Sequence, residues 1–334
     1  MKRIKIAQIG TMHDHAKPTF NSLLKNDDIF EVVGIAEICS GREKRLYDDA
    51  PHLTLEELLR MDDLEAVAIE TEEEKATEIA QLFADKGIAV HLDKPGSPDI
   101  AAFNRLVDTL KEKNAVLQMG YMYRYNPALQ DIFTAVKNGE LGEIYSVEAQ
   151  MSVHHDPDKH IWLQNYPDGM MYFLGCHMVD LVYRLMGEPL EVIRLNARTG
   201  QDNPDTVDFG FCVFRYENGS SFVKSCSAEI NGFDRRQLII CGTKGTVEVN
   251  PLERFYHHAD GSYLQHTLYR MTTCDTEKDP WNNNGPFIDT GSFDRYDTMM
   301  REFGAYIRGK ENPYGYEFEK KLFRLVMECV GVTE

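Results

Sequence analysis

The chain has 334 residues, of which 43% are hydrophobic, so it is long enough for two domains with ample cores. Its formal net charge of -18 argues against nucleic acids and anionic membranes as partners, because both bind basic surfaces. Seven cysteines without metal-type spacing favour a reducing, cytoplasmic location over a disulfide framework, and the N-terminal apolar run is too short for a signal peptide or membrane span.

Short buried strands alternate with helices over the first 120 residues, which is typical of a parallel sheet wound with helices on both faces. The expected strands cover 4–9, 32–36, 66–69, 89–92 and 116–119. Between the last two, a helix is predicted by the apolar face of Phe103, Leu106, Val107 and Leu110. Three helix starts are predicted from a Ser or Thr with Glu three positions later, because such pairs satisfy free backbone N–H groups. They are Ser40 with Glu43, Thr54 with Glu57, and Thr71 with Glu74.

The second half contains an expected strand at 144–153 and two hairpins. Alternating residues at 207–216 and 220–228 flank Glu217-Asn218-Gly219, and Asn-Gly between apolar runs favours a tight hairpin. A second turn separates 238–241 from 246–250, Asp260-Gly261 indicates a third, and a final helix is expected at 317–330. No linker composition separates the two halves, so topology alone sets the predicted domain boundary after residue 121.

The end of the first strand has features of a dinucleotide site. Such a site needs a strand, a glycine turn and a helix N-terminus, because free backbone N–H groups then face the pyrophosphate. Gly10 occupies the first glycine position, whereas Met12 and His15 occupy the other two. Glu37 ends the second strand, where a carboxylate accepts hydrogen bonds from ribose hydroxyls and repels a 2′-phosphate. This favours NAD over NADP, although the nearby Arg42 leaves the preference open, and a solvated strand-end role for Glu37 is the alternative.

Several short motifs follow one another in an order that resembles one family of oxidoreductases. They are Gly10 at the strand end, Glu37, Asp93-Lys94-Pro95, Arg124-Tyr125-Asn126-Pro127, Gly139-Glu140-Leu141-Gly142-Glu143, Gly175-Cys176-His177-Met178-Val179-Asp180 and Gly242-Thr243-Lys244-Gly245-Thr246. Over most of its length the chain therefore resembles the glucose-fructose oxidoreductase, inositol dehydrogenase and MocA family.

The resemblance implies an α/β fold with a Rossmann dinucleotide-binding domain at 1–121 and a substrate-binding and oligomerisation domain at 122–334. The second domain is expected to be α+β, with an open, mainly antiparallel sheet. Because the exposed face of this sheet commonly makes subunit contacts in the family, we expect a homodimer or homotetramer. The cofactor is expected to contact Gly10, Thr11, Met12, His13, Glu37, Thr71, Asp93 and Lys94.

Hydride transfer from an alcohol requires a base for the hydroxyl proton, a cation for the developing alkoxide, and fixed geometry toward the nicotinamide. By resemblance, Lys94 lies between nicotinamide and substrate and suits the second task. His177 suits the first, because imidazole titrates near neutrality. Asp180, three residues later, either orients that imidazole or makes a structural hydrogen bond. A surface lysine and a core histidine are the alternatives for the two catalytic residues.

The family pattern is broken at Phe173, where relatives usually carry an aspartate one helical turn before the histidine. Phenylalanine can neither accept a proton nor balance the charge of a lysine. Either His177 with Tyr172 or Tyr123 completes the proton relay, or the chain no longer performs ordinary alcohol oxidation.

The segment 154–162 contains three histidines, two aspartates and a tryptophan. The spacing of these residues matches no structural zinc motif, so we assign no metal ligands. A metal site and a purely structural loop are the two alternatives. A polar loop that contacts a sugar is favoured. Including Arg124, which is expected to contact substrate or the other domain, the predicted substrate residues are Tyr123, Arg124, His155, His160, Trp162, Tyr172, Phe173 and His177.

The sequence thus predicts an NAD-dependent oxidoreductase that acts on a sugar, cyclitol or related polyol, with the substrate class taken from the resemblance. One alternative is a redox-neutral sugar enzyme that retains NAD for elimination, glycoside cleavage or epimerisation. Another is a cofactor- or sugar-binding protein whose chemistry was lost with the change to Phe173.

Overall fold

A computed structural model describes residues 2–38, 50–202, 205–259, 263–277, 281 and 285–333. The predicted helix start at Ser40 and Glu43, the position of Arg42 and the turn at Asp260-Gly261 lie outside these residues. The chain divides into two compact units. The first comprises 1–122 and 295–323, and the second comprises 123–294 and 324–334.

The first unit is built on a five-stranded sheet in the order β2-β1-β3-β4-β5, in which every neighbouring pair is parallel. The strands are β1 (Ile4–Ile9), β2 (Phe30–Ala36), β3 (Ala66–Ile69), β4 (Ala89–Leu92) and β5 (Leu117–Met119). Every residue of β3 and β4 is buried, as expected for strands covered on both faces. The predicted Rossmann-type sheet is confirmed.

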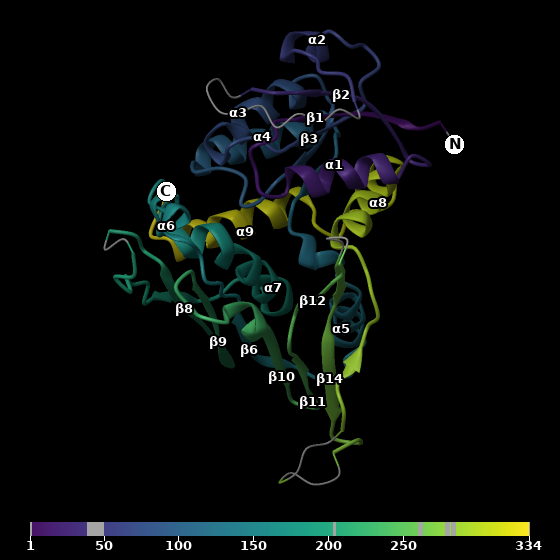
Figure 1. The fold of residues 1–334 in the computed structure, drawn as a ribbon. Helices are drawn as coiled ribbons and strands as arrows, with labels where there is room; N and C mark the ends of the chain where they lie inside the picture. Colours follow the sequence, from purple (N-terminus) through teal and green to yellow (C-terminus); the bar gives the residue numbers. More distant parts are fainter. Residues whose placement is uncertain are drawn as a thin grey trace. The chain divides into compact units, whose positions relative to one another are not determined.

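Helices from both ends of the chain pack in the first unit. They are α1 (Ala16–Lys25), α2 (Leu55–Leu59), α3 (Glu73–Ala84), α4 (Ile100–Glu112), α8 (Arg295–Ile307) and the first part of α9 (Tyr316–Cys329). Helix α8 lies beside α1 (Figure 1). Phe323 of α9 stacks on Phe103 of α4, with ring centroids 4.2 Å apart. Helix α8 and the first part of α9 were predicted to belong to the domain at 122–334, but they pack in the first unit.

Two of the predicted helix starts fall on described residues, and they differ in outcome. At α2 the Thr54 side chain accepts from the Glu57 N–H, and the Glu57 carboxylate accepts from the Thr54 N–H, so this capping box is confirmed. The start at Thr71 is wrong, because α3 begins at Glu73 and Thr71 still belongs to the segment that leaves β3. Its hydroxyl donates to the Glu72 carbonyl instead of accepting from the helix.

The second unit contains an eight-stranded sheet in the order β15-β14-β11-β10-β6-β9-β8-β7. The strands are β6 (Ile144–Gln150), β7 (Glu191–Arg194), β8 (Phe209–Tyr216), β9 (Gly219–Cys226), β10 (Gln237–Gly242), β11 (Gly245–Val249), β14 (Leu268–Thr273) and β15 (Ile288–Asp289). Among these neighbours only β6 and β9 are parallel, so the mainly antiparallel sheet is confirmed. Both predicted hairpins form, with Tyr216 opposite Gly219 and Cys241 opposite Thr246.

Helices cover one face of this sheet. The short π-helix η2 (Met171–Gly175) contacts β8 and β9, and it continues into α7 (Cys176–Met186), which packs on β6 and β9. The remaining elements are η1 (Met122–Tyr125), α5 (Pro127–Lys137), α6 (Pro157–Leu163), η3 (Gly232–Arg235) and the separate pair β12 (Arg254–His257) and β13 (Tyr263–His266). None of the helices in the described part of the chain has both the length and the apolar character needed to span a bilayer.

The other face of the sheet carries apolar side chains in a cross-strand row. Ile193 of β7 lies opposite Val213 of β8, which lies opposite Phe222 of β9. The ring of Phe222 stacks on Phe211, with centroids 5.5 Å apart. Ile193 is 42% exposed and the other three are partly exposed. This apolar row (Ile193, Phe211, Val213, Phe222) is therefore open to solvent in the single chain.

Candidate functional site

The turn after β1 requires a glycine. Gly10 has a φ of 87°, and a Cβ atom at this position would lie 2.8 Å from the backbone oxygen of Glu70. Its N–H donates to the carbonyl of Ala36 at the end of β2, at 2.7 Å. The backbone of the turn therefore lies close against the carboxyl ends of the neighbouring strands. Dinucleotides bind at this edge of such sheets.

A pocket of about 510 Å³ lies beside this turn. It is lined by Thr11, Ile35, Glu37, Ile38, His52, Leu53, Thr54, Leu55 and Glu56. The Thr11 hydroxyl donates to the Glu37 carboxylate, whose other oxygen accepts from the Ile38 N–H at 3.1 Å. The carboxylate is therefore oriented at the end of β2, where the ribose of a dinucleotide is expected. This pocket brings together two of the predicted cofactor residues, Thr11 and Glu37.

Two adjacent buried residues, Asp93 and Lys94, follow the end of β4. Asp93 accepts from the Lys94 N–H through Oδ1 at 2.7 Å, and the Lys94-Pro95 peptide is cis. The Lys94 side chain is only 1% exposed although it is a lysine. A buried ammonium group is costly unless it has partners, so this position is more specialised than a surface lysine that follows a strand.

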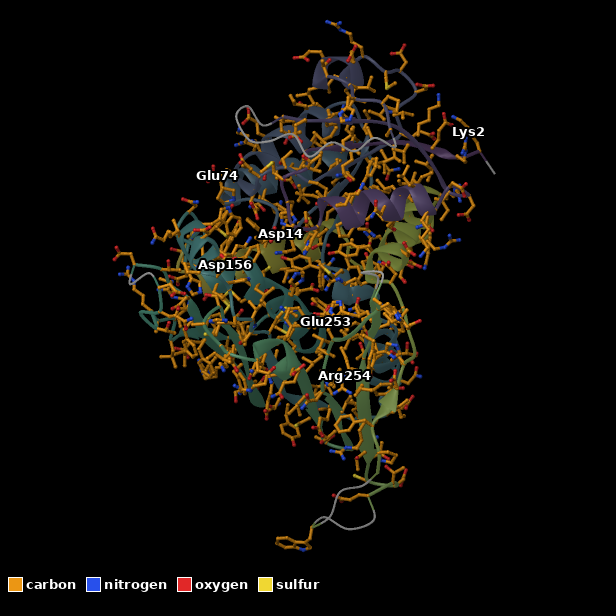
Figure 2. All side chains as sticks on the ribbon, viewed as in Figure 1. Lys2, Asp14, Glu74, Asp156, Glu253 and Arg254 are labelled. Carbon is orange, nitrogen blue, oxygen red and sulfur yellow. The ribbon has the colours of Figure 1, made fainter. Side chains whose placement is uncertain are left out.

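Two histidines of the β1 turn converge on Asp93. His13 Nδ1 contacts Asp93 Oδ2, and His15 Nδ1 lies 3.0 Å from the same oxygen. His13 Nδ1 is also 3.7 Å from Glu70, and its Nε2 is 3.5 Å from Glu73. His13, Glu70, Glu73 and Asp93 are buried, whereas Asp14 and Glu74, labelled in Figure 2, are exposed. His13 and Asp93 were each predicted as cofactor residues, whereas Glu70 was not, although an acidic residue directly after a buried strand is a signal that the sequence contains.

The protonation of this cluster follows from burial and mutual charge. Burial lowers the pKa of His13, but the charges of Asp93 and Glu73 more than offset this and raise it to about 10. Burial raises the pKa of Asp93, but His13 and His15 bring it well below its usual range. Burial lowers the pKa of His15 to about 4 against the opposing charge of Asp93. Burial and the charge of Asp93 raise the pKa of Glu70 well above its usual range.

In the second unit, Arg124 is held by an aspartate of α7. Its Nε lies 2.9 Å from Asp180 Oδ1 and its Nη2 lies 2.8 Å from the same oxygen, with both side chains buried. Burial raises the pKa of Asp180, and the guanidinium of Arg124 opposes that shift. Asp180 is therefore engaged with Arg124, in agreement with the structural alternative for this residue.

His177 lies in the first turn of α7 and is buried. The ring of Tyr123 meets it edge to face, with centroids 5.0 Å apart. Tyr123 in turn donates to Glu253 at 2.5 Å, and Glu253 is buried while the adjacent Arg254 is exposed (Figure 2). The Glu253 carboxylate also accepts from Arg236 at 2.6 Å. This buried acid beside Tyr123 was missed, because nothing in its sequence context links 253 to 123.

Phe173 lies in η2 and packs against the histidine-rich segment. Trp162 meets its ring edge to face at 5.0 Å, the His155 ring is at 6.2 Å, and Lys159 Nζ is 4.5 Å from the ring centroid. The structure thus groups three of the predicted substrate residues, Phe173, Trp162 and His155, in one aromatic cluster.

Two other predicted residues of this region, His160 and Tyr172, have contacts of their own. His160 is fully buried, with Nε2 3.2 Å from the Ser227 carbonyl and Nδ1 3.3 Å from Asp202. Tyr172 stacks on Tyr166, with ring centroids 5.6 Å apart. The contacts of His160 resemble those of a core histidine that ties two segments together.

Two family models match the chain. Residues 4–121 match the oxidoreductase family with an NAD-binding Rossmann fold, and residues 129–248 match the GFO/IDH/MocA C-terminal domain. An uncharacterized oxidoreductase of Schizosaccharomyces pombe is 29% identical over 200 residues, 58% of this chain. The match covers 54% of that relative, so the chain spans about half of its length.

Other relatives are matched over more of their length. A D-apiose dehydrogenase of Paraburkholderia graminis is 24% identical over 78% of this chain and 72% of its own. A myo-inositol 2-dehydrogenase of Thermotoga maritima is 22% identical over 73% of each chain. Among solved structures, an aldose-aldose oxidoreductase from Caulobacter crescentus superposes with a TM-score of 0.77 at 16% identity, covering 98% of this chain and 96% of the other. A 3-ketoreductase from Actinomadura kijaniata, in complex with NADP and TDP-benzene, has a TM-score of 0.74 at 18% identity, covering 97% and 96%.

Proposed function

Because this chain belongs to the GFO/IDH/MocA family of oxidoreductases, we propose that it is an NAD-dependent oxidoreductase of a sugar, cyclitol or related polyol. The observation that carries the proposal is the pocket beside Gly10, in which Thr11 orients the Glu37 carboxylate at the end of β2. The substrate class is supported by relatives named for D-apiose and myo-inositol.

The residues of this chain suit a cofactor of that kind. The Gly10 turn lets backbone N–H groups approach a pyrophosphate, and Glu37 accepts from the adenosine ribose hydroxyls. When bound, NAD supplies the hydride acceptor. In the proposed reaction, Lys94 stabilises negative charge on the substrate oxygen and His177 accepts the hydroxyl proton. A panel of sugars and polyols, assayed by nicotinamide absorbance, tests the proposal, and no turnover of any member with either NAD or NADP would contradict it.

Cofactor preference is expected to depend on Glu37. Replacing Glu37 with Ser should narrow the preference for NAD over NADP by roughly 1–3 kcal/mol, because charged hydrogen bonds to the ribose are lost along with the repulsion of a 2′-phosphate. Calorimetric titration of both cofactors measures the change. Glu31→Ser is the matched control, since Glu31 lies on β2, the strand that Glu37 follows, and pairs with Arg3 instead of lining the pocket. Tighter binding of NADP than NAD to the unmodified protein would contradict the assignment.

Lys94 is expected to act on the chemical step. Lys94→Ala should slow hydride transfer about 10²–10³-fold, the usual cost of removing one group that stabilises an oxyanion. NAD affinity should stay within a few fold, because the pyrophosphate and ribose contacts lie elsewhere. Single-turnover absorbance and calorimetry separate the two effects. Lys86→Ala, which removes an exposed lysine before β4, is the control, and an equal loss in both variants would refute the role.

The apolar row Ile193, Phe211, Val213 and Phe222 is expected to be covered by a second subunit. Soluble chains avoid large exposed apolar patches, so we propose a homodimer or homotetramer formed through this sheet face. Sedimentation velocity at micromolar concentration should detect the oligomer, and Phe222→Glu should shift it toward monomer. A monomeric unmodified protein under these conditions would rule the proposal out.

A further inference from the structure

The turn after β1 and the end of β4 bring together two histidines and an aspartate, His13, His15 and Asp93. Two imidazole nitrogens, His13 Nδ1 and His15 Nδ1, face the same carboxylate oxygen, Asp93 Oδ2. These ligand atoms lie within 4.8 Å of one another. Two histidines and one carboxylate around a common point form a donor set that binds borderline divalent ions.

Two of these three side chains, Asp93 and His13, also contact neighbouring groups that would hold them in position around a metal ion. Asp93 uses its other oxygen, Oδ1, to accept the Lys94 N–H at 2.7 Å. The remaining ring nitrogen of His13, Nε2, lies 3.5 Å from the Glu73 carboxylate. Histidines that bind a metal commonly have a carboxylate at the second ring nitrogen, and carboxylates that bind a metal are commonly hydrogen-bonded, because these contacts fix ligand orientation.

A fourth group points to a ligand independently. Glu70 is fully buried, and among the described residues no hydrogen bond of normal length and geometry reaches either of its carboxylate oxygens, although Thr19 and Asp93 lie near them. One oxygen lies 3.7 Å from His13 Nδ1 and the other 3.9 Å from His91 Nε2. A buried carboxyl group without hydrogen bonds is costly. Together with Asp93 and Glu73 it surrounds His13 with three carboxyl groups, which is an environment that a cation would stabilise.

We propose that His13, His15 and Asp93, with Glu70 as a further ligand, bind one divalent transition-metal ion such as Zn²⁺. Nitrogen ligands favour such an ion over Ca²⁺ and Mg²⁺, which prefer oxygen. Binding of the ion is coupled to release of protons, because imidazole nitrogens and carboxylates bind a metal only when deprotonated. Because His13 and His15 follow β1 and Asp93 follows β4, the ion would tie the end of β1 to the end of β4.

The test uses full-length, tag-free protein that has been treated with a chelator and contains no nucleotide, so it does not depend on the proposed oxidoreductase function. Zn²⁺ titration by calorimetry should give one site per chain, and Co²⁺ should give the visible absorption of a nitrogen- and oxygen-ligated ion. Mg²⁺ and Ca²⁺ should not compete. His15→Ala and Asp93→Asn should each weaken Zn²⁺ binding more than Glu73→Gln, for which the outer-shell cost is about 10–100-fold.

His154→Ala, which removes an exposed histidine of the second unit, is the matched control and should leave the Zn²⁺ affinity unchanged. Circular dichroism verifies that each variant is folded, and Asp93→Asn keeps the side-chain shape if His15→Ala proves unstable. The proposal is overturned if the unmodified protein takes up no Zn²⁺ or Co²⁺, or if both ligand variants bind Zn²⁺ as tightly as the unmodified protein.

Discussion

Replacing His177 with alanine is expected to slow hydride transfer about 10²–10⁴-fold, because the variant lacks the proposed acceptor of the hydroxyl proton. The imidazole is buried at the start of α7 and packed edge to face against Tyr123, so its position is fixed. Single-turnover rates at saturating substrate isolate the chemical step from binding. The control is His258→Ala, whose side chain is exposed and lies outside the predicted substrate segment 154–162.

A second variant, Phe173→Asp, introduces the carboxylate that the family resemblance leads us to expect at this position. We expect it to create or raise dehydrogenase activity on a polyol that fits the site. Lys159 Nζ, 4.5 Å from the Phe173 ring centroid, can pair with the new charge and limit the cost of burying it. If the unmodified protein reduces NAD efficiently and His177→Ala has the same rate, the catalytic assignment is wrong.

Arg124→Met is expected to lower the free energy of unfolding by about 3–5 kcal/mol, because it leaves the buried Asp180 carboxylate without its partner. The double variant Arg124→Met with Asp180→Leu should recover much of that loss, since it removes both buried charges. Urea or guanidinium unfolding followed by circular dichroism measures each step of this cycle.

An exposed ion pair of the same unit provides the comparison. Arg324 bonds Glu188, with both side chains about half exposed. Arg324→Met should cost at most about 1 kcal/mol, because water and salt screen such pairs. Equal losses for Arg124→Met and Arg324→Met would show that the buried pair contributes no more than a surface pair. A stable Arg124→Met protein with weakened sugar binding would instead favour the predicted substrate contact.

Local patterns predicted the elements that frame the site. The residue limits of β1, β3 and β4 agree with the prediction, because an apolar run bounded by turn residues is a signal contained in the run itself. The Thr54 and Glu57 capping box was predictable for the same reason, since both partners lie within one turn. The prediction at Thr71 failed although the Thr-Glu spacing was right, because the helix begins one residue later than a Thr71 cap requires, with Glu72 at the N-cap position.

Local periodicity and short motifs in the amino-acid sequence were enough to predict the Rossmann pattern and the family, and they are the basis on which Gly10, Glu37, Lys94 and His177 are proposed as site residues. The tertiary structure decided which distant residues meet. It placed His13 and His15 against Asp93, eighty or so positions later in the chain, and it paired Arg124 with Asp180. These contacts depend on strand order and on the path of the backbone, and the free energy of a buried charge depends on all the groups around it, so no pattern confined to one segment could specify them.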